Sequence, residues 1–323
     1  MHTLIGIFEI EAAAGLIAPH VVRTPTVPSP GLGALLGAPV TVKLELLQRT
    51  GSFKARGAAA KLLSLSEAER AAGVVAVSGG NHGIALAVMA AALDVKATVV
   101  MPRTAPARSR ALAEEAGASL RLTDGMDGAF ELGMRLADEG LTLVHPFDDP
   151  AVIAGQGTVG LELAEDAAED RTDVAVSIGG GGLIPGIAAA LRVRRPGVRV
   201  WGVETAGAEA MSAALTAGGP VPVPLSSLVT TLSAPAVSRL TYDHAAKLVE
   251  DVLVVPDHEA VQGCLDLSTH AKLWAEPAAG CLLPAAREIL SRVGPGAHLG
   301  LVVCGGNTTL AEVTGWAERF GLG

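Results

Sequence analysis

The feature that most restricts the fold of this 323-residue chain is a repeated alternation of short apolar runs with helical stretches. Residues 73–78 and 96–101 have the apolar, β-branched character of strands, and the alanine-rich residues 84–93 between them favour a helix. Continuous apolar strands joined by helices are typical of parallel sheets that are covered on both faces. The pattern therefore predicts a three-layer α/β protein with mostly parallel sheets.

The alternation continues along most of the chain and favours a division into two domains. Further strands are predicted at residues 119–123, 141–145, 173–178, 198–203 and 298–303. Further helices are predicted at residues 106–116, 129–139, 151–166 and 183–193. We expect a small domain at residues 70–146, inserted in a large domain formed by residues 1–69 and 147–323. Residues 218–235, rich in Gly, Pro and Ser, are expected to form an irregular surface loop.

Charge and composition limit the partners of the chain. The net charge is −9, so the basic surface that nucleic acids require is not indicated. Apolar stretches such as residues 84–93 are too short to span a bilayer. The three cysteines are widely spaced and form no CxxC pair, which indicates neither a disulfide framework nor a zinc site. We therefore expect a cytoplasmic protein that binds neither nucleic acid nor membrane.

Three glycine-rich turns follow predicted strands, where open α/β sheets bind their ligands. They are SGGNHG at residues 78–83, GGGG at residues 179–182 and CGGN at residues 304–307. Four glycines before a helix let backbone amides converge on an anion, so residues 179–182 predict a phosphate site; a flexible turn is the alternative. The spacing is not GxGxxG, which disfavours a dinucleotide.

A further segment, GSFKARGA at residues 51–58, completes a recognisable set of motifs. Together with the three turns, the sequence HPFDDPAVIAGQGT at residues 145–158 and the pair Glu276-Pro277, it resembles the fold-type II pyridoxal-phosphate enzymes. The most similar group is that of serine/threonine dehydratases and serine racemases. The resemblance implies a fold like that of the tryptophan synthase β subunit, with two three-layer α/β domains, and a homodimer.

The resemblance also implies roles for individual residues. Lys54 is expected to carry pyridoxal 5′-phosphate and to act as the catalytic base, with Phe53 beside the cofactor ring. Asn81 is expected to bind the phenolic oxygen, and Cys304 to face the pyridine nitrogen. The implied cofactor-binding residues are Phe53, Lys54, Asn81, Gly179, Gly180, Gly181, Gly182, Glu276 and Cys304. The implied binding residues for the substrate carboxylate are Ser78, Gly79, Gly80, Asn81 and His82.

Three of these residues have a simpler structural interpretation. Asn81 is also a common type of helix cap. Cys304 is equally compatible with a buried core thiol, which is what most free cysteines are. Glu276 precedes a proline and suits the start of a helix as a carboxylate.

The residue types at the site favour one reaction. A neutral partner such as Cys304 leaves the pyridine nitrogen unprotonated, which favours loss of a β-substituent. Racemases of this group have a serine where Gly79 stands. We therefore expect α,β-elimination from L-threonine or L-serine, which yields a 2-oxo acid and ammonia. The TIADG segment of the family is not recognisable at residues 229–235, so the substrate is less firmly indicated than the reaction. A dehydratase of a bulkier 3-hydroxy amino acid, a β-replacement synthase, a serine racemase and a non-catalytic cofactor-binding protein are the alternatives.

A divalent cation is a further alternative that the resemblance raises. Many relatives bind one through a Glu and an Asp, and Glu204 matches the first position. The second position is Ala210, with Glu209 beside it. Mg²⁺ or Mn²⁺ at Glu204 would therefore be one carboxylate short.

Overall fold

The computed structural model describes residues 4–166, 172–294 and 296–322, and the strands in this part of the chain form two sheets. The larger sheet has six strands in the order β1-β2-β10-β7-β8-β9. β1 is antiparallel to β2, and every other neighbouring pair is parallel. The strands are β1 (Thr26–Pro28), β2 (Val40–Lys43), β7 (Asp173–Ser177), β8 (Arg199–Thr205), β9 (Asp251–Val255) and β10 (Leu299–Val302).

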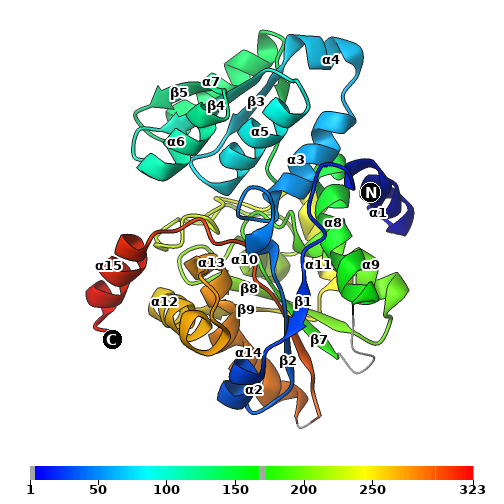
Figure 1. Ribbon diagram of the computed structural model, residues 1–323, viewed down its shortest axis with the longest axis vertical. Helices are drawn as coiled ribbons and strands as arrows, with labels where there is room; N and C mark the ends of the chain where they lie inside the picture. The colour runs from blue at the N-terminus through cyan, green and yellow to red at the C-terminus, as the bar shows by residue number, and fades with distance from the viewer. Residues whose placement is uncertain (1–3, 167–171, 295, 323) are drawn as a thin grey trace.

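The smaller sheet has four parallel strands in the order β5-β4-β3-β6. They are β3 (Val74–Val77), β4 (Ala97–Pro102), β5 (Ser119–Thr123) and β6 (Thr142–Leu143), joined by α5 (Asn81–Ala92), α6 (Ala107–Glu115) and α7 (Met126–Asp138). These elements all fall within residues 70–146 and form the upper part of Figure 1. That this part is a domain of its own stays a prediction.

The remaining helices cover the larger sheet and connect it to the smaller one. In Figure 1, α8 and α9 lie to the right of the larger sheet, and α12, α13 and α14 lie to its left, so the predicted three layers are present. These helices are α1 (Ile7–Ile17), α2 (Pro30–Leu36), α3 (Lys54–Leu63), α4 (Glu67–Ala72), α8 (Pro150–Glu165), α9 (Ile184–Arg194), α10 (Ala210–Ala217), α11 (Arg239–Leu248), α12 (Asp257–Asp266), α13 (Pro277–Gly280), α14 (Leu282–Val293) and α15 (Leu310–Phe320). Two short helices are the 3₁₀ turn η1 (Glu45–Leu47) and the π turn η2 (Leu267–Ala271).

Small residues allow α3, α8 and α9 to pack closely. A Cβ atom on Gly186 of α9 would lie 2.6 Å from the Cα atom of Gly157 in α8. A Cβ atom on Gly57 of α3 would lie 2.4 Å from the amide of Gln156 in α8. Larger side chains do not fit at such distances. The closely packed α8 and α9 therefore form a rigid support for the start of α3.

A buried ionic cluster ties the same end of α3 to the larger sheet. The guanidinium of Arg56 donates to Glu45 in η1 at 2.8 Å and to Glu162 in α8 at 2.6 Å. Lys43 of β2 also donates to Glu162. Arg56, Lys43 and Glu45 are fully buried, so each of them depends on its partners to offset the cost of leaving water. The cluster therefore fixes α3 two residues after Lys54.

The observed elements overlap the predicted ones, with bounds that differ by up to three residues. α5 begins at Asn81 and α7 at Met126, each three residues before its predicted start. β6 ends at Leu143, two residues before the predicted end of that strand. Residues 218–235 contain no helix or strand, as predicted, but they do not all lie at the surface. Val229 and Leu232 are buried, because this loop packs against the turn after β7, where a Cβ atom on Gly179 would lie 3.1 Å from the carbonyl oxygen of Leu232. The prediction of a surface loop is wrong for these residues.

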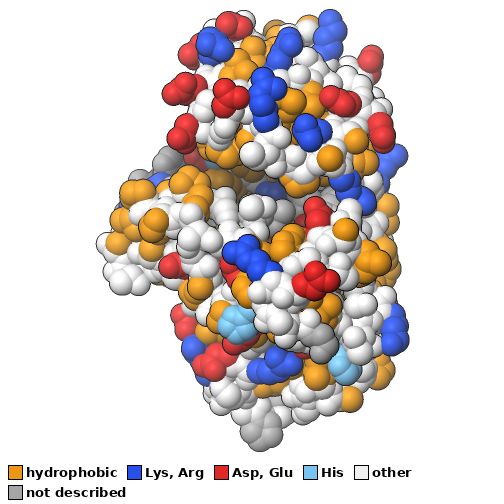
Figure 2. Space-filling view, turned by 90° about the vertical axis from the view of Figure 1, so that its left-hand side faces the viewer, with side chains coloured by type: hydrophobic (Ala, Val, Ile, Leu, Met, Phe, Trp, Pro, Cys, Tyr) orange, Lys and Arg blue, Asp and Glu red, His pale blue; other side chains and the backbone are white. Residues whose placement is uncertain are grey.

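The outer surface is of mixed polarity. The face in Figure 2 is hollowed between the upper part, which holds the smaller sheet, and the part below it. Basic and acidic side chains are interspersed on this face. Within the described residues, no helix combines the length and the apolar character needed to cross a membrane.

Candidate active site

Lys54 is the first residue of α3, and its amino group contacts a distant segment. Nζ donates a hydrogen bond to the carbonyl oxygen of Pro146 at 3.0 Å and lies 5.0 Å from the centre of the Phe53 ring. Burial lowers the pKa of Lys54 to about 8, although the nearby Cys304 and Glu276 act in the opposite direction. A lysine with this pKa has a substantial neutral fraction near neutral pH, as a nucleophile or a general base requires.

The turn after β10 lies directly beside this lysine. Ser52 forms an antiparallel bridge with Gly305, and the amide of Phe53 donates to the carbonyl oxygen of Cys304 at 3.1 Å. The hydroxyl of Ser52 is buried and has no hydrogen-bond partner among the described residues. The structure therefore brings two of the predicted motifs together and leaves a polar atom unsatisfied between them.

Asn81 links the turn after β3 to the same place through its side chain. Its Nδ2 donates to Oε1 of Glu276 at 2.7 Å, and its Oδ1 accepts from Nδ2 of Asn307 at 2.7 Å. The residue at the cap position of α5 is Gly80, and Asn81 makes no capping bond. The interpretation of Asn81 as a helix cap is therefore wrong.

Glu276 lies behind Asn81, at the start of α13. Its side chain makes no capping bond and accepts from Asn81 instead, so its place at a helix start does not explain its contacts. A Cβ atom on Gly305 would lie 2.2 Å from Oε1 of Glu276, so glycine is required there. Burial raises the pKa of Glu276 to about 7, against the lowering effect of the Asn81 hydrogen bond.

The residues predicted to bind a carboxylate form the turn between β3 and α5. The amides of Gly79, Asn81 and His82 make no hydrogen bond with another described residue, and they lie at a helix N-terminus that favours an anion. His82 is buried, and its Nε2 contacts the carbonyl oxygen of Val144 at 2.8 Å. Burial lowers the pKa of His82 to about 3, so its ring is neutral and Nε2 carries the proton.

The four glycines form the turn between β7 and α9, and their amides also lack partners among the described residues. The side chain that forces glycine here is Phe147. A Cβ atom on Gly180 would lie 2.1 Å from its ring, and one on Gly182 would lie 2.9 Å from its Cβ atom. Gly181 has a φ of +84°, which also favours glycine. One side of the turn thus packs on Phe147, and its amides remain free for an anion.

Cys304 is a buried thiol at the end of β10. Its Sγ lies 3.9 Å from the hydroxyl oxygen of Ser177, the last residue of β7. Since Ser177 donates its proton to the carbonyl of Ala278, the thiol is the donor in this contact. Burial raises the pKa of Cys304 well above its usual value, so the group is neutral. Cys304 is thus a buried thiol, and it also lies at the site, beside the segment that carries Lys54.

Glu204 is committed to a helix rather than to a ligand site. Oε1 accepts from the amide of Met211 at 2.7 Å, and Oε2 accepts from the amide of Ser212 at 2.9 Å, so the carboxylate caps α10. Among the described residues, no group of three or more His, Cys, Asp or Glu side chains is placed to hold a metal ion.

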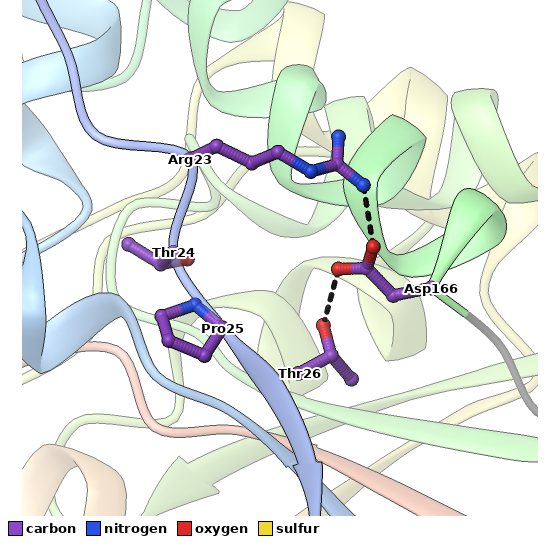
Figure 3. Close-up of a pocket in the computed structure, with 5 residues that line it drawn as sticks. All are labelled: Arg23, Thr24, Pro25, Thr26 and Asp166. Carbon is purple, nitrogen blue, oxygen red and sulfur yellow. Dashed lines mark hydrogen bonds and ion pairs between the residues drawn. The ribbon is translucent and has the colours of Figure 1, made fainter.

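A separate hollow of about 440 Å³ lies away from these residues, between the start of β1 and the end of α8. Figure 3 shows its lining: Arg23 and Thr26 both contact Asp166, and these side chains close on one another rather than leave free polar groups. Asp166 is the last described residue before a gap at residues 167–171. We assign no role to this hollow.

Three contributors to the site are absent from the sequence predictions. They are Ser177, Asn307 and Phe147. Asn307 belongs to the CGGN turn and Phe147 to the HPFDD segment, so both lie in motifs that pointed to the site. Ser177 stands at the carboxyl end of a predicted strand, which was the available signal.

A lysine with a lowered pKa, two turns with free amides and a neutral buried thiol define an enzyme of the α/β class that binds an anionic cofactor. The sequence profile of the family described as pyridoxal-phosphate dependent enzyme matches residues 17–305. The chain therefore belongs to the pyridoxal-phosphate dependent enzymes.

Individual relatives resemble the chain over nearly its full length. It is 37% identical to the L-threonine ammonia-lyase of Thermotoga maritima over 94% of this chain and 76% of that protein. It is 36% identical to the phenylserine dehydratase of Ralstonia pickettii over 98% of this chain and 97% of that protein. Among solved structures, maize serine racemase superposes with a TM-score of 0.91, with 32% identity over 99% of this chain and 98% of that one.

The residues present fit pyridoxal phosphate. The free amides of residues 179–182 offer donors for a phosphate, and the lowered pKa of Lys54 suits attachment to an aldehyde. The unsatisfied hydroxyl of Ser52 and the second amide proton of Asn81 are further polar groups without a partner on the described chain.

Proposed function

We propose that this enzyme is a dehydratase, or ammonia-lyase, that converts L-threonine or L-serine to a 2-oxo acid and ammonia by α,β-elimination. The observation that carries this proposal is the neutral, buried thiol of Cys304 next to the segment of Lys54. A carboxylate in that place would protonate the pyridine nitrogen, whereas a thiol does not. The names of relatives with 36% and 37% identity support the same reaction class.

The proposed roles follow the geometry of the side chains. Lys54 would hold the cofactor covalently and would move the α-proton, because its lowered pKa leaves more of its amine neutral near neutral pH than in an ordinary lysine. Asn81 would donate its second amide proton to the phenolic oxygen of the cofactor, and Phe53 would pack beside the cofactor ring. The amides of residues 179–182 would hold the phosphate, and the amides of Gly79, Asn81 and His82 would hold the substrate carboxylate. The amides of Ser78 and Gly80 donate within the chain, to the carbonyl of Val100 and the hydroxyl of Ser78. When bound, the cofactor supplies the electron sink that stabilises negative charge at the α-carbon.

The absence of a side chain at residue 79 favours elimination over racemisation. A racemase needs a second acid or base on the far side of the substrate, and Gly79 has none to offer. A Cβ atom on Gly79 would lie 3.2 Å from the Cβ atom of Ala105 and 3.5 Å from Pro102. Even a serine would therefore displace the neighbouring segment slightly.

A dehydratase of a bulkier 3-hydroxy amino acid is the second candidate. The relative from Ralstonia pickettii carries the name phenylserine dehydratase and matches the chain almost from end to end. In addition, residues 229–235 differ from the family pattern and reach the site, since a Cβ atom on Gly80 would lie 3.7 Å from Cγ2 of Thr231. This loop is the part of the site whose sequence is suited to select the substrate side chain.

A homodimer rests on the resemblance alone. A cytoplasmic location rests on the widely spaced cysteines and the short apolar stretches, and a small amino-acid substrate rests on the resemblance and on the names of the relatives. A divalent cation at Glu204 has little support, because both carboxylate oxygens already accept hydrogen bonds from the chain.

The test is an assay of 2-oxo acid and ammonia with L-threonine, L-serine, D-serine and L-threo-3-phenylserine. We expect equal amounts of both products from an L-3-hydroxy amino acid, and the amounts from each substrate decide between the two candidates. Lys54→Ala should abolish the products. Lys61→Ala, in the same helix and paired with Asp149 at 2.7 Å, is the matched control and should retain them. Cofactor-loaded protein that forms no product from any of these substrates would contradict the proposal.

A further inference from the structure

The side-chain amide of Asn307 uses both of its protons in the site. Nδ2 donates to the carbonyl oxygen of Thr50 at 2.8 Å and to Oδ1 of Asn81 at 2.7 Å. These bonds connect three segments that are far apart in the sequence: the turn before α3, the start of α5 and the turn after β10. Asn307 therefore lies between the backbone next to Lys54 and the amide of Asn81.

The Thr50 carbonyl determines how both amides are oriented. A backbone carbonyl only accepts, so the nitrogen of Asn307 must face Thr50. The second proton on that nitrogen then requires an acceptor, which is the oxygen of Asn81. Consequently the nitrogen of Asn81 faces Glu276 and gives it one proton, at 2.7 Å. One proton on the nitrogen of Asn81 remains without an acceptor on the described chain.

Gly51 provides the space in which Asn307 is held. A Cβ atom on Gly51 would lie 2.4 Å from Oδ1 of Asn307, and the residue has a φ of +71°. The amide of Gly306 also donates to the carbonyl of Gly51 at 2.9 Å, which joins the two turns. The side chain of Asn307 is therefore packed against a backbone that cannot carry a larger residue without moving it.

We propose that Asn307 is a positioning residue, which orients the amide of Asn81 so that its remaining proton is available to the phenolic oxygen of the cofactor. This inference rests on the proposed role of Asn81. Asn307 does not itself touch the cofactor in this proposal; it acts by preventing the opposite orientation, in which the oxygen of Asn81 would face the phenolic oxygen and repel it.

The variant that tests the inference is Asn307→Asp. A carboxylate has no proton for Thr50 or Asn81, so the oxygen of Asn81 loses its donor and faces a second acceptor, and only Glu276 still holds the amide of Asn81 in its orientation. We expect the dissociation constant of pyridoxal phosphate to rise by roughly three- to tenfold, as for the loss of one hydrogen bond. The pH at which the visible absorption of the lysine-linked cofactor changes should also shift. Thr309→Ala removes only the cap of α15 and should change neither property.

A double-mutant cycle shows whether Asn307 acts through Asn81. Added to Asn81→Ala, the Asn307→Asp change should weaken cofactor binding little further. Should Asn307→Asp not fold, Gly51→Ala displaces the same amide from its other side and should produce the same shift. Unchanged affinity and spectra in Asn307→Asp, together with a clear loss in Asn81→Ala, would overturn the inference. No loss in Asn81→Ala would instead overturn the proposed role of Asn81, and the inference with it.

Discussion

The amino group of Lys54 donates a hydrogen bond to the carbonyl oxygen of Pro146, 92 residues later in the chain. Pro146 lies just after the last strand of the smaller sheet, whereas Lys54 begins α3, whose buried residues pack against both α5 and α8. Two residues before Pro146, the carbonyl of Val144 binds His82. One short segment thus contacts both the lysine and the turn predicted to bind the substrate carboxylate.

The pKa of Lys54 can be tested through the rate at which cofactor-free protein takes up pyridoxal phosphate. Only the neutral amine attacks an aldehyde, and the pKa of this lysine is lowered to about 8. We therefore expect the rate constant to rise with pH and to level off above about pH 8. The rise in visible absorption after mixing gives this rate. A rate that still increases steeply up to the usual pKa of a lysine, about 10.4, would contradict the lowered value.

Arg56→Ala should destabilise the protein strongly. Without the guanidinium, Glu45 loses its ion-pair partner in the cluster, and Glu162 retains its ion pair with Lys43. We expect a loss of about 3–5 kcal/mol in the free energy of unfolding, as for a broken buried pair. Denaturant unfolding measures it. In the exposed pair of Arg103 with Asp124, Arg103→Ala should have almost no effect, and an equal effect of both variants would refute the importance of the cluster.

Glu276→Gln should change how stability depends on pH in the cofactor-free protein. The folded pKa of Glu276 is raised from 4.5 to about 7. The stabilisation that comes from protonating Glu276 in the folded state is therefore fully present below pH 4.5 and is lost as the pH rises to 7. Relative to the Gln variant, the free energy of unfolding of the wild type should fall by about 3 kcal/mol between pH 4.5 and pH 7, and should fall no further above pH 7. Unfolding curves at several pH values test this, and a constant difference between the two proteins would show that the pKa is not raised.

Gly180→Ala should disturb the phosphate turn through Phe147. The added methyl group would lie 2.1 Å from the phenyl ring of Phe147. We therefore expect the free energy of unfolding to fall by about 1–3 kcal/mol and the cofactor to bind more weakly. The double variant Gly180→Ala with Phe147→Leu should recover part of the stability and part of the cofactor affinity that Gly180→Ala alone loses. Gly197→Ala has no neighbour within 4 Å and is the matched control. If Phe147→Leu rescues neither property, the ring is not what requires glycine at residue 180.

Cys304→Ser and Cys304→Asp test whether elimination requires a neutral side chain at the end of β10. Serine is a neutral polar residue there, and aspartate is a charged one. Serine is also neutral and can keep the contact with Ser177, so elimination should continue within about tenfold of the wild-type rate. In the cofactor-free protein, aspartate places a negative charge in a buried position near Glu276 and should cost about 3–5 kcal/mol in unfolding free energy. Thermal unfolding and 2-oxo acid formation are the measurements. Faster elimination by the Asp variant would contradict the role given to a neutral group.

Much of the fold and of the site followed from sequence patterns, for a physical reason. Parallel strands bring their carboxyl ends to one edge of a sheet, so turns that follow β7 and β10 had to lie close together. The convergence of Lys54, Asn81 and Cys304 required the family resemblance as well. A lysine in a glycine-flanked segment has no distinguishing pattern by itself, and its lowered pKa arises only from burial in the folded chain.

The features that escaped prediction depend on contacts between distant residues. Phe147 fills the space beneath Gly180, although 33 positions separate them in the numbering. The orientation of Asn307 depends on a backbone carbonyl at Thr50. The burial of Leu232 depends on packing against the turn after β7, while its local sequence, rich in turn-forming residues, favours a surface loop. None of these relationships leaves a periodic or compositional signal in the sequence.

Lys54 is proposed to carry the cofactor where the start of α3 meets the turns after β3 and β10. The most direct measurement is reduction of the cofactor-loaded protein with borohydride, followed by mass spectrometry of its peptides. We expect one pyridoxyl group per chain, located on the peptide that contains Lys54 and released from that peptide when L-threonine is supplied before reduction. A cofactor attached to another residue, such as Lys61 in the same helix, would contradict it.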